Sequence, residues 1–373
     1  MPYDYPFCYV KDKNDNYLWV SNETLLSGGY TLIYRDYHAV PNPVTEAAAY
    51  ATWLKVQYDY YVLFADLVDG WKNEYNWGNT VQFYFEGINE PEFQDLIHKR
   101  GTYANDTYTR GYYSTAEMAK ILTDVSYYMT LAVGNTGYIT TPALTNISSN
   151  SKSPIDTHGV YCDALLAAMY AQINDEVAPT AIDGITPENT QDENDYFTCL
   201  NWHPYLPWFK EEDTTMYYGE IVTTDHWLFG KTTKAEVNSK YADMWVAWNN
   251  NMYQIAVNGG DTDSPKVFFS EFGVCDWGSP TSGNYKTMGI NEQLAATVFK
   301  TLLGHANDLV FVDELTVMAF RAFDNEELGI GEGNFGMIDE NGQIKAIMKE
   351  YYIIINGNDD TSSLQAKIDE YFN

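Results

Sequence analysis

Two glutamates follow apolar runs and could together perform acid–base and nucleophilic chemistry. Glu90 lies in the segment F-E-G-I-N-E-P (85 to 91), and Glu271 lies in F-F-S-E-F-G (268 to 273). Two carboxylates about 5 to 5.5 Å apart can cleave a glycosidic bond with retention, one as an acid of raised pKa and the other as an ionised nucleophile. Either glutamate alone is also explained as a solvated loop carboxylate, because the chain has 52 acidic residues.

The elements that must position these glutamates alternate between strand-like and helix-like patterns. This alternation predicts βα units and a parallel sheet. The predicted strands cover 29 to 40, 80 to 90, 137 to 144, 196 to 205, 266 to 274 and 315 to 323. The predicted helices cover about 44 to 74, 115 to 134, 159 to 176, 239 to 257, 291 to 308 and 343 to 355. No repeat or linker divides the chain, so we expect one catalytic domain over 1–357 and a polar tail, with a short terminal helix, over 358–373.

Polar residues at the ends of the predicted strands favour a barrel over an open sheet. These residues are His38, Asn89, Glu90, His203, Tyr205, Glu271 and Arg321. In a (β/α)8 barrel the functional residues gather at the carboxyl ends of several strands. An open dinucleotide-binding sheet would carry a G-x-G-x-x-G turn, which this sequence lacks.

Taken in order, these motifs resemble those of clan A glycoside hydrolases, and families 39 and 5 of that clan are the most similar. The resemblance implies that Glu90 is the acid/base, that Asn89 binds the sugar 2-hydroxyl and that Glu271 is the nucleophile. The segment N-W-H-P-Y (201 to 205) resembles the His-x-Tyr pattern of strand 6. By the same resemblance His203 and Tyr205 belong to the substrate site, where Tyr205 would hydrogen-bond the nucleophile. Residues 335 to 345 resemble the passage before the last barrel helix.

The resemblance begins late in the barrel. If 29 to 40 is strand 3, with His38 where family 5 members carry a histidine, 28 residues precede it, whereas two βα units need about 60. We therefore expect an N-terminally incomplete TIM (β/α)8-type barrel of six to seven strands. Residues 9 to 28 would then form the loop and helix after strand 2, and an arginine that the clan often carries on strand 2 would be absent. Where the clan frequently has a tryptophan on strand 8, this chain has Phe320, Arg321 and Phe323.

Composition limits the partners. The net charge of −31 repels nucleic acid, anionic lipid and strongly anionic substrates. Together with this charge, the resemblance to glycoside hydrolases implies a neutral oligo- or polysaccharide as substrate. The 32 tyrosines and 10 tryptophans supply flat rings that can stack on sugars. Trp208 and Trp277 follow strands 6 and 7 and are candidates for such stacking, with packing inside the loops as the alternative.

Neither a metal nor a cofactor is expected. The histidines lack ligand spacing, and the cysteines form no C-x-x-C pair and are interpreted as buried thiols: Cys8, Cys162, Cys199 and Cys275. The start MPYDYPFCYV lacks the pattern of a signal peptide, so no compartment is predicted, although an extracellular or periplasmic site would suit a polysaccharide substrate. Oligomeric state is left open.

The combined prediction is a retaining β-glycoside hydrolase that acts by double displacement on a β-glucan, mannan or xylan. Long insertions near the predicted barrel mouth favour endo action. The first alternative is a non-catalytic carbohydrate-binding pseudoenzyme with a truncated barrel. The second is an α/β enzyme of another type, such as an isomerase, which would need a metal or phosphate site that the sequence does not reveal.

Overall fold

The core of the protein is a set of parallel strands surrounded by helices. The computed structural model describes residues 7–11, 17–21, 40–77, 81–89, 91, 114–145, 162–188, 190, 192–204, 234–260, 265–273, 292–319, 321–324, 336–339, 341–358 and 360–372.

The core strands pair in parallel throughout. Their bounds are β3 Tyr84–Phe85, β4 Tyr138–Ile139, β5 Leu144–Thr145, β6 Cys199–His203, β7 Lys266–Phe272, β8 Leu315–Ala319, β9 Arg321–Phe323 and β10 Gly336–Ile338. The hydrogen-bonded orders are β3-β4, β5-β6-β7-β8 and β9-β10. Isolated parallel bridges, Thr140 to Cys199 and Asn89 to Ala143, connect the first pair to the larger sheet.

The predicted α/β class with parallel strands is confirmed, and five of the six predicted strands are present. The sixth, 29 to 40, lies outside the described residues apart from Val40. Within the described part of the chain no strand pairs β8, β9 or β10 back to β3, so the barrel is not closed.

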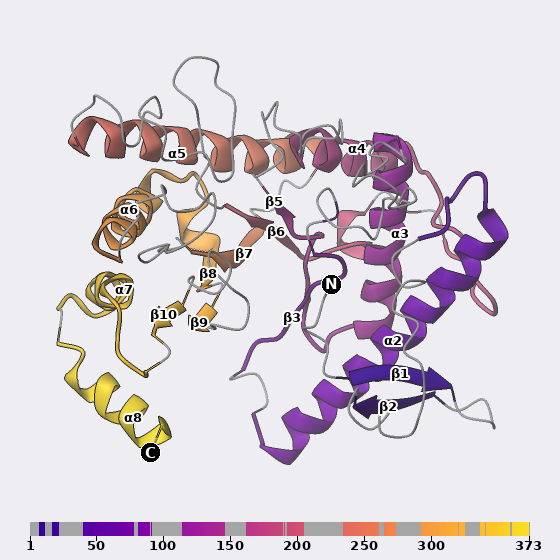
Figure 1. The fold of residues 1–373 in the computed structure, drawn as a ribbon. Helices are drawn as coiled ribbons and strands as arrows, with labels where there is room; N and C mark the ends of the chain where they lie inside the picture. Colours follow the sequence, from indigo (N-terminus) through magenta and orange to yellow (C-terminus); the bar gives the residue numbers. More distant parts are fainter. Residues whose placement is uncertain are drawn as a thin grey trace, which may run out of the picture.

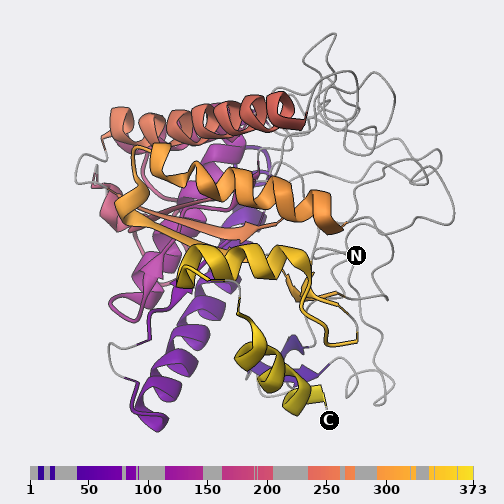
Figure 2. The same cartoon turned by 90° about the vertical axis from the view of Figure 1, so that its left-hand side faces the viewer.

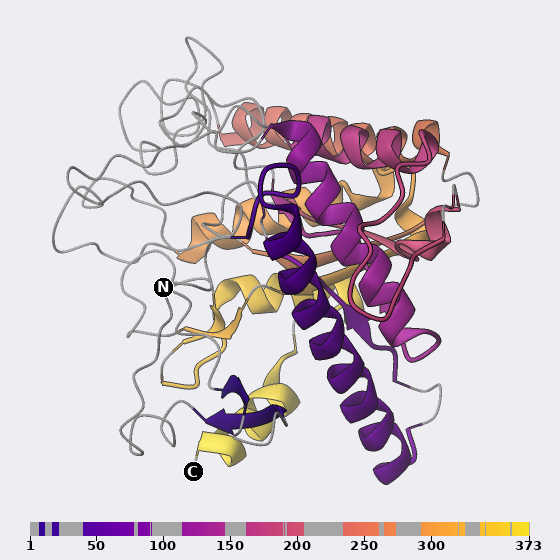
Figure 3. The ribbon, with the colours of Figure 1, turned by 90° about the vertical axis from the view of Figure 1, so that its right-hand side faces the viewer.

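Six helices follow one another around these strands (Figure 1). They are α2 Ala47–Glu74, α3 Thr115–Val133, α4 Cys162–Asn174, α5 Lys234–Gly259, α6 Glu292–Gly304 and α7 Ala346–Asn356, and all six were predicted from the sequence. Each helix contacts the next along the chain, from α2 to α7. Figure 2 shows α5, α6 and α7 with nearly parallel axes, and Figure 3 shows α2 beside α3. None of the described helices is both long enough and apolar enough to cross a membrane.

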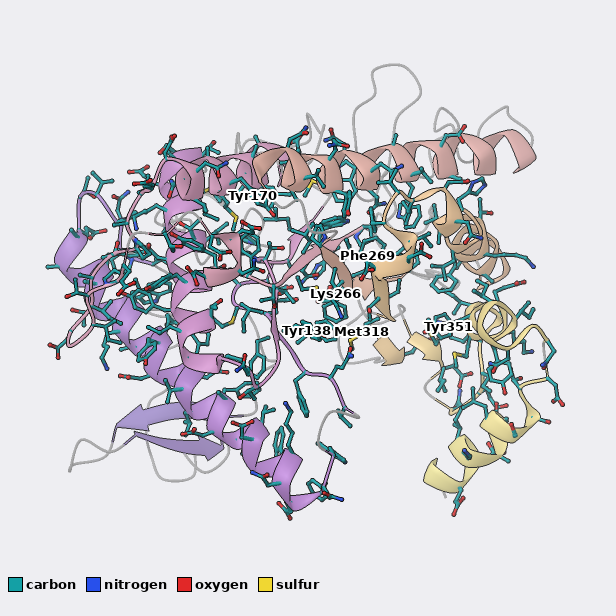
Figure 4. All side chains as sticks on the ribbon, turned by 180° about the vertical axis from the view of Figure 1, so that it is seen from behind. Tyr138, Tyr170, Lys266, Phe269, Met318 and Tyr351 are labelled. Atoms are coloured by element: carbon teal, nitrogen blue, oxygen red, sulfur yellow. The ribbon has the colours of Figure 1, made fainter. Side chains whose placement is uncertain are left out.

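Aromatic side chains join the outer face of the sheet to α5. Trp202 of β6 and Phe269 of β7 lie 5.9 Å apart, and Phe269 lies 6.1 Å from Trp245 of α5 (ring centroids; Phe269 is labelled in Figure 4). The indole of Trp202 donates to Asn249 Oδ1 at 2.7 Å, which satisfies both polar groups in a buried setting. These contacts fix α5 against the strands that carry the candidate site.

The inward face of the strands changes character along its length. At the amino ends, the ring centroid of Tyr84 lies 5.2 Å from that of Tyr138 and 4.4 Å from that of Phe268. Lys266 donates to the Tyr138 hydroxyl at 2.9 Å, and the two residues lie side by side in Figure 4. Two residues further along their strands, the aromatic residues are succeeded by Glu86, Thr140 and Ser270. The aromatic layer therefore supports a polar layer nearer the carboxyl ends.

The interpretation of residues 9 to 28 as a loop and helix is wrong for the described part of that range. β1 (Phe7–Lys11) and β2 (Tyr17–Ser21) form an antiparallel pair in which Tyr9 faces Trp19. Both segments are rich in aromatic and β-branched residues, and D-K-N-D-N, a polar turn-forming run, separates them in the sequence. Local strand propensity and turn chemistry together favour a hairpin over a helix.

The C-terminal segment contains a helix, α8 Ser362–Phe372, as the sequence predicted. Its Gln365 accepts a hydrogen bond from the Ile344 backbone N–H at 3.1 Å and donates to the Gly342 carbonyl at 2.7 Å. The segment is thus attached to the turn before α7. The division into a domain over 1–357 and a tail remains a prediction.

Candidate active site

The candidate site lies at the carboxyl ends of neighbouring parallel strands. His203 is the last residue of β6, Glu271 is the next to last residue of β7, and Asn89 follows β3 and bridges to Ala143. Because parallel strands end at the same edge of a sheet, these residues come from distant parts of the chain to one side of the molecule. This edge is where the polar residues were expected to gather.

The imidazole of His203 contacts the side chains of two consecutive residues of β7, Ser270 and Glu271. Its Nε2 is 3.0 Å from Ser270 Oγ, and its Nδ1 is 3.5 Å from Glu271 Oε2. Neighbouring residues of a regular strand point to opposite faces, but the register between β7 and β8 shifts between Phe269 and Phe272. A bulge of this kind redirects a side chain, which explains how both residues reach one imidazole.

Behind His203 lies a partly buried polar network centred on Glu86. Glu86 Oε2 accepts from Ser270 Oγ at 2.6 Å and from Asn201 Nδ2 at 2.7 Å. Asn201 Oδ1 in turn accepts from the Ser270 backbone N–H at 3.3 Å, which fixes the orientation of the amide. Thr141 Oγ1 accepts from the Asn201 backbone N–H at 2.7 Å. The strand ends are therefore joined by side chains as well as by the sheet.

His203 and Glu271 differ in their exposure to solvent. The side chain of His203 is 0% exposed and that of Glu271 is 24% exposed, so the carboxylate can reach solvent or a ligand. Asn89 Oδ1 is buried and has no hydrogen-bond partner among the residues described. An unpaired buried acceptor is costly, and a bound hydroxyl group would satisfy it.

Several predicted site residues lie outside the described part of the chain: His38, Glu90, Tyr205, Trp208, Trp277 and, on strand 8, Phe320. The backbone of Arg321 and Phe323 forms β9. The separation of about 5 to 5.5 Å between the Glu90 and Glu271 carboxyl groups therefore remains a prediction.

The sequence pattern did not single out Asn201 or Ser270, and it gave Glu86 no role at the site. A signal was nevertheless present, because each of the three lies two residues from an inward-facing residue of its own strand: Glu86 from Tyr84, Asn201 from His203 and Ser270 from Phe268. No group of three His, Cys, Asp or Glu side chains suited to a metal occurs in the described ranges. Cys162 and Cys199 are buried, as predicted, whereas Cys8 and Cys275 have no described burial.

Comparison with known proteins gives structural matches only. The sequence matches no protein-family model and no curated protein. The structure is similar to a glycoside hydrolase family 17 β-1,3-glucanosyltransferase from Rhizomucor miehei, with a TM-score of 0.33 and 12% identity over 66% of this chain and 59% of that one. It is also similar to a β-glucuronidase from Ruminococcus gnavus, with a TM-score of 0.35 and 12% identity over 72% of this chain and 31% of that one.

A third similar structure is a GH5-4 broad specificity endoglucanase from Clostridium acetobutylicum. Its TM-score is 0.41, with 15% identity over 85% of this chain and 69% of that one. The chain spans less than two thirds of the length of the first two proteins. The three matches to glycoside hydrolases thus cover 66%, 72% and 85% of this chain.

Proposed function

We propose that this protein is a retaining β-glycoside hydrolase with a (β/α)8-type catalytic domain. Glu271 serves as the nucleophile and Glu90 as the acid/base, in a double displacement through a covalent glycosyl-enzyme. The observation that carries the proposal is the partly exposed Glu271 carboxylate at the end of β7, 3.5 Å from the buried imidazole of His203.

A carboxylate nucleophile must be ionised, accessible and held in one orientation. Glu271 is 24% exposed, which meets the second requirement. The His203 ring meets the third, because it contacts Glu271 through Nδ1 and Ser270 through Nε2. A protonated Nδ1 would also favour the ionised carboxylate, which is the first requirement.

Asn89 supports the assignment of the sugar side of the site. Its Oδ1, which has no hydrogen-bond partner in the described part of the chain, can accept a hydrogen bond from a sugar hydroxyl. Hydrogen bonds to the 2-hydroxyl strengthen in the transition state of such reactions. Glu90 is the next residue, so the acid/base would lie beside this contact. The net charge of −31 favours a neutral substrate, such as a β-glucan, mannan or xylan.

The test is hydrolysis of a panel of these polysaccharides and of matching aryl glycosides, with NMR detection of the anomer released first. Retention is expected. Glu271→Ala should remove nearly all turnover, and azide should not restore the original product. Glu90→Ala should retain activity on substrates with good leaving groups, and azide should accelerate release of the sugar.

Glu74→Ala is the matched control, because Glu74 is an exposed glutamate at the carboxyl end of α2, before the amino end of β3. Its activity should equal that of the wild type. Equal losses for Glu90→Ala and Glu271→Ala on every substrate would contradict the assigned roles. Saturable binding of oligosaccharide without any turnover would instead identify a non-catalytic carbohydrate-binding protein.

A further inference from the structure

Four side chains from three strand ends form one connected series behind the proposed nucleophile. Glu86 Oε2 lies 2.6 Å from Ser270 Oγ, Ser270 Oγ lies 3.0 Å from His203 Nε2, and His203 Nδ1 lies 3.5 Å from Glu271 Oε2. We propose that Glu86 and Ser270 are positioning residues that hold His203 with a proton on Nε2 and with Nδ1 directed at Glu271. The effect of this arrangement on catalysis rests on the proposed function, whereas the position of the proton does not.

The hydroxyl of Ser270 determines which ring nitrogen carries the proton. A serine hydroxyl has one hydrogen, and Ser270 donates it to Glu86 Oε2. Toward His203 the same oxygen can therefore only accept. The Nε2 of His203 must supply the hydrogen for that contact, because one ring nitrogen of a neutral imidazole donates while the other accepts.

Glu86 is itself held in place, which gives the series a fixed end. Its Oε2 also accepts from Asn201 Nδ2 at 2.7 Å, and the Asn201 backbone is bound by Thr141 on both its N–H and its carbonyl. Asn201 is 1% exposed and His203 is fully buried, whereas Glu86 and Ser270 are half-buried. Side chains of the strands thus contribute to the orientation of His203.

The consequence for catalysis concerns Nδ1. With Nε2–H committed to Ser270, any second proton on the ring is placed on Nδ1, facing the Glu271 carboxylate. A neutral ring with its proton on Nδ1 would instead leave Nε2 without a hydrogen for Ser270. The contacts through Ser270 therefore leave Nδ1 as the ring atom that gains or loses a proton in response to the charge of Glu271. When Nδ1 is protonated, it can donate to the Glu271 carboxylate and hold that group in one orientation for attack.

The contacts Ser270–His203–Glu271 also have the connectivity of a serine hydrolase triad. In such a triad the serine donates its hydrogen to the histidine, which acts as a base. Here the hydrogen is donated to Glu86, at the shorter distance of 2.6 Å against 3.0 Å to His203. Ser270 is accordingly assigned to positioning and not to nucleophilic attack.

Long-range ¹H–¹⁵N correlation spectra show which imidazole nitrogen carries a proton, so they test this arrangement without substrate. A His203→Asn variant identifies the His203 signal among those of the six histidines. The wild type should keep a protonated Nε2 over the whole pH range in which it is folded. Ser270→Ala removes the acceptor at Nε2, so the neutral ring should move its proton to Nδ1. Ser270→Thr, which retains the hydroxyl, should behave like the wild type.

Thr141→Val is the matched control, because it removes a buried hydroxyl bonded to Asn201 without touching His203. It should leave Nε2 protonated. If Ser270→Ala does not fold, the wild-type spectrum still decides. An unprotonated Nε2 in the neutral wild-type ring, identical spectra for wild type and Ser270→Ala, or labelling of Ser270 by a fluorophosphonate would overturn the assignment.

The catalytic consequence is measured separately. Ser270→Ala should lower kcat about tenfold, the size expected for one hydrogen bond, while KM stays nearly constant and Ser270→Thr restores kcat. An unchanged kcat in a Ser270→Ala protein whose Nε2 has lost its proton would overturn the positioning role. Absence of turnover in the wild type would overturn only the proposed function, because the spectra do not depend on it.

Discussion

Asp124 and Glu271 are both acids beside a basic side chain, but their surroundings differ. Asp124 of α3 is 1% exposed and accepts hydrogen bonds from Lys120, from the Tyr50 hydroxyl at 3.0 Å, and from the N–H and hydroxyl of Thr180 at 3.1 and 2.8 Å. Glu271 is 24% exposed, and its contact with His203 is a longer 3.5 Å.

The difference lies in how far each carboxylate is withdrawn from solvent. Asp124 receives donors on both oxygens, as a buried charge requires, and it ties α2, α3 and the segment around Thr180 together. Glu271 keeps solvent access, which costs packing but leaves room for a ligand. We therefore expect Asp124 to act on stability and Glu271 to act on turnover.

The largest expected effect is on catalysis at Glu271. Glu271→Gln keeps the size of the side chain but cannot form a stable glycosyl ester, so kcat should fall by at least about 1,000-fold. The free energy of unfolding in urea should change by less than about 0.5 kcal/mol, because the side chain is partly exposed. A loss of stability comparable to that of an Asp124 variant would remove the distinction between the two sites.

At Asp124 we expect a loss of stability with little change in turnover. Asp124→Asn leaves Lys120 beside a neutral group inside the protein and should lower the free energy of unfolding by about 3 kcal/mol, while activity per folded molecule is retained. Asp59→Asn is the matched control. Its pair with Lys55 has the same i,i+4 spacing, a distance of 2.7 Å and exposures of 28% and 31%, so its loss should cost about 0.5 kcal/mol or less.

Asn89 allows a test of the part of the site that would bind the sugar. Because Asn89 Oδ1 has no hydrogen-bond partner among the described residues, Asn89→Ala should lower the free energy of unfolding by no more than about 0.5 kcal/mol. On a substrate with a 2-hydroxyl, kcat/KM should fall about tenfold. On the corresponding 2-deoxy substrate, wild type and variant should differ little, and an equal loss on both would argue against a contact with that hydroxyl.

Much of the fold followed from sequence pattern because the apolar runs of the strands and the periodicity of the helices are local signals. The motifs also predicted which edge of the sheet would collect polar residues, and His203, Asn89 and Glu271 lie there. The hairpin of β1 and β2 was missed because the resemblance to a known barrel took precedence over local strand propensity.

The contacts between these residues could not be predicted. The run F-F-S-E-F reads as a regular strand, in which Ser270 and Glu271 would face opposite sides, and the register shift against β8 is a tertiary feature. Likewise, Lys120 and Asp124 read as an exposed i,i+4 pair. Only the packing of Tyr50 and Thr180 over them makes Asp124 a buried charge.

The smallest expected effect is the response of the Asp124 region to alkali. Burial first, and the charge of Asp124 second, raise the pKa of Tyr196 to about 12 and raise the pKa values of Tyr50 and Tyr128 as well. In the unfolded chain a tyrosine titrates near pH 10, so above that pH the unfolded state loses protons that the folded state keeps. The stabilisation by each tyrosine is therefore complete below pH about 10 and is lost as the pH rises from there toward the folded pKa.

Urea unfolding at a series of pH values from about 8 to 11 measures this loss, which should not exceed about 1.4 kcal/mol per pH unit for each tyrosine. Tyr196→Phe should make the decline shallower by about 1 kcal/mol at pH 11, since one titrating group is removed. Tyr75→Phe, at the exposed end of α2, is the control and should follow the wild type. A wild-type free energy of unfolding that stays constant up to pH 11 would show that folding does not raise the pKa values of the tyrosines around Asp124. The contrast with the Glu271 site would then rest on hydrogen bonding alone.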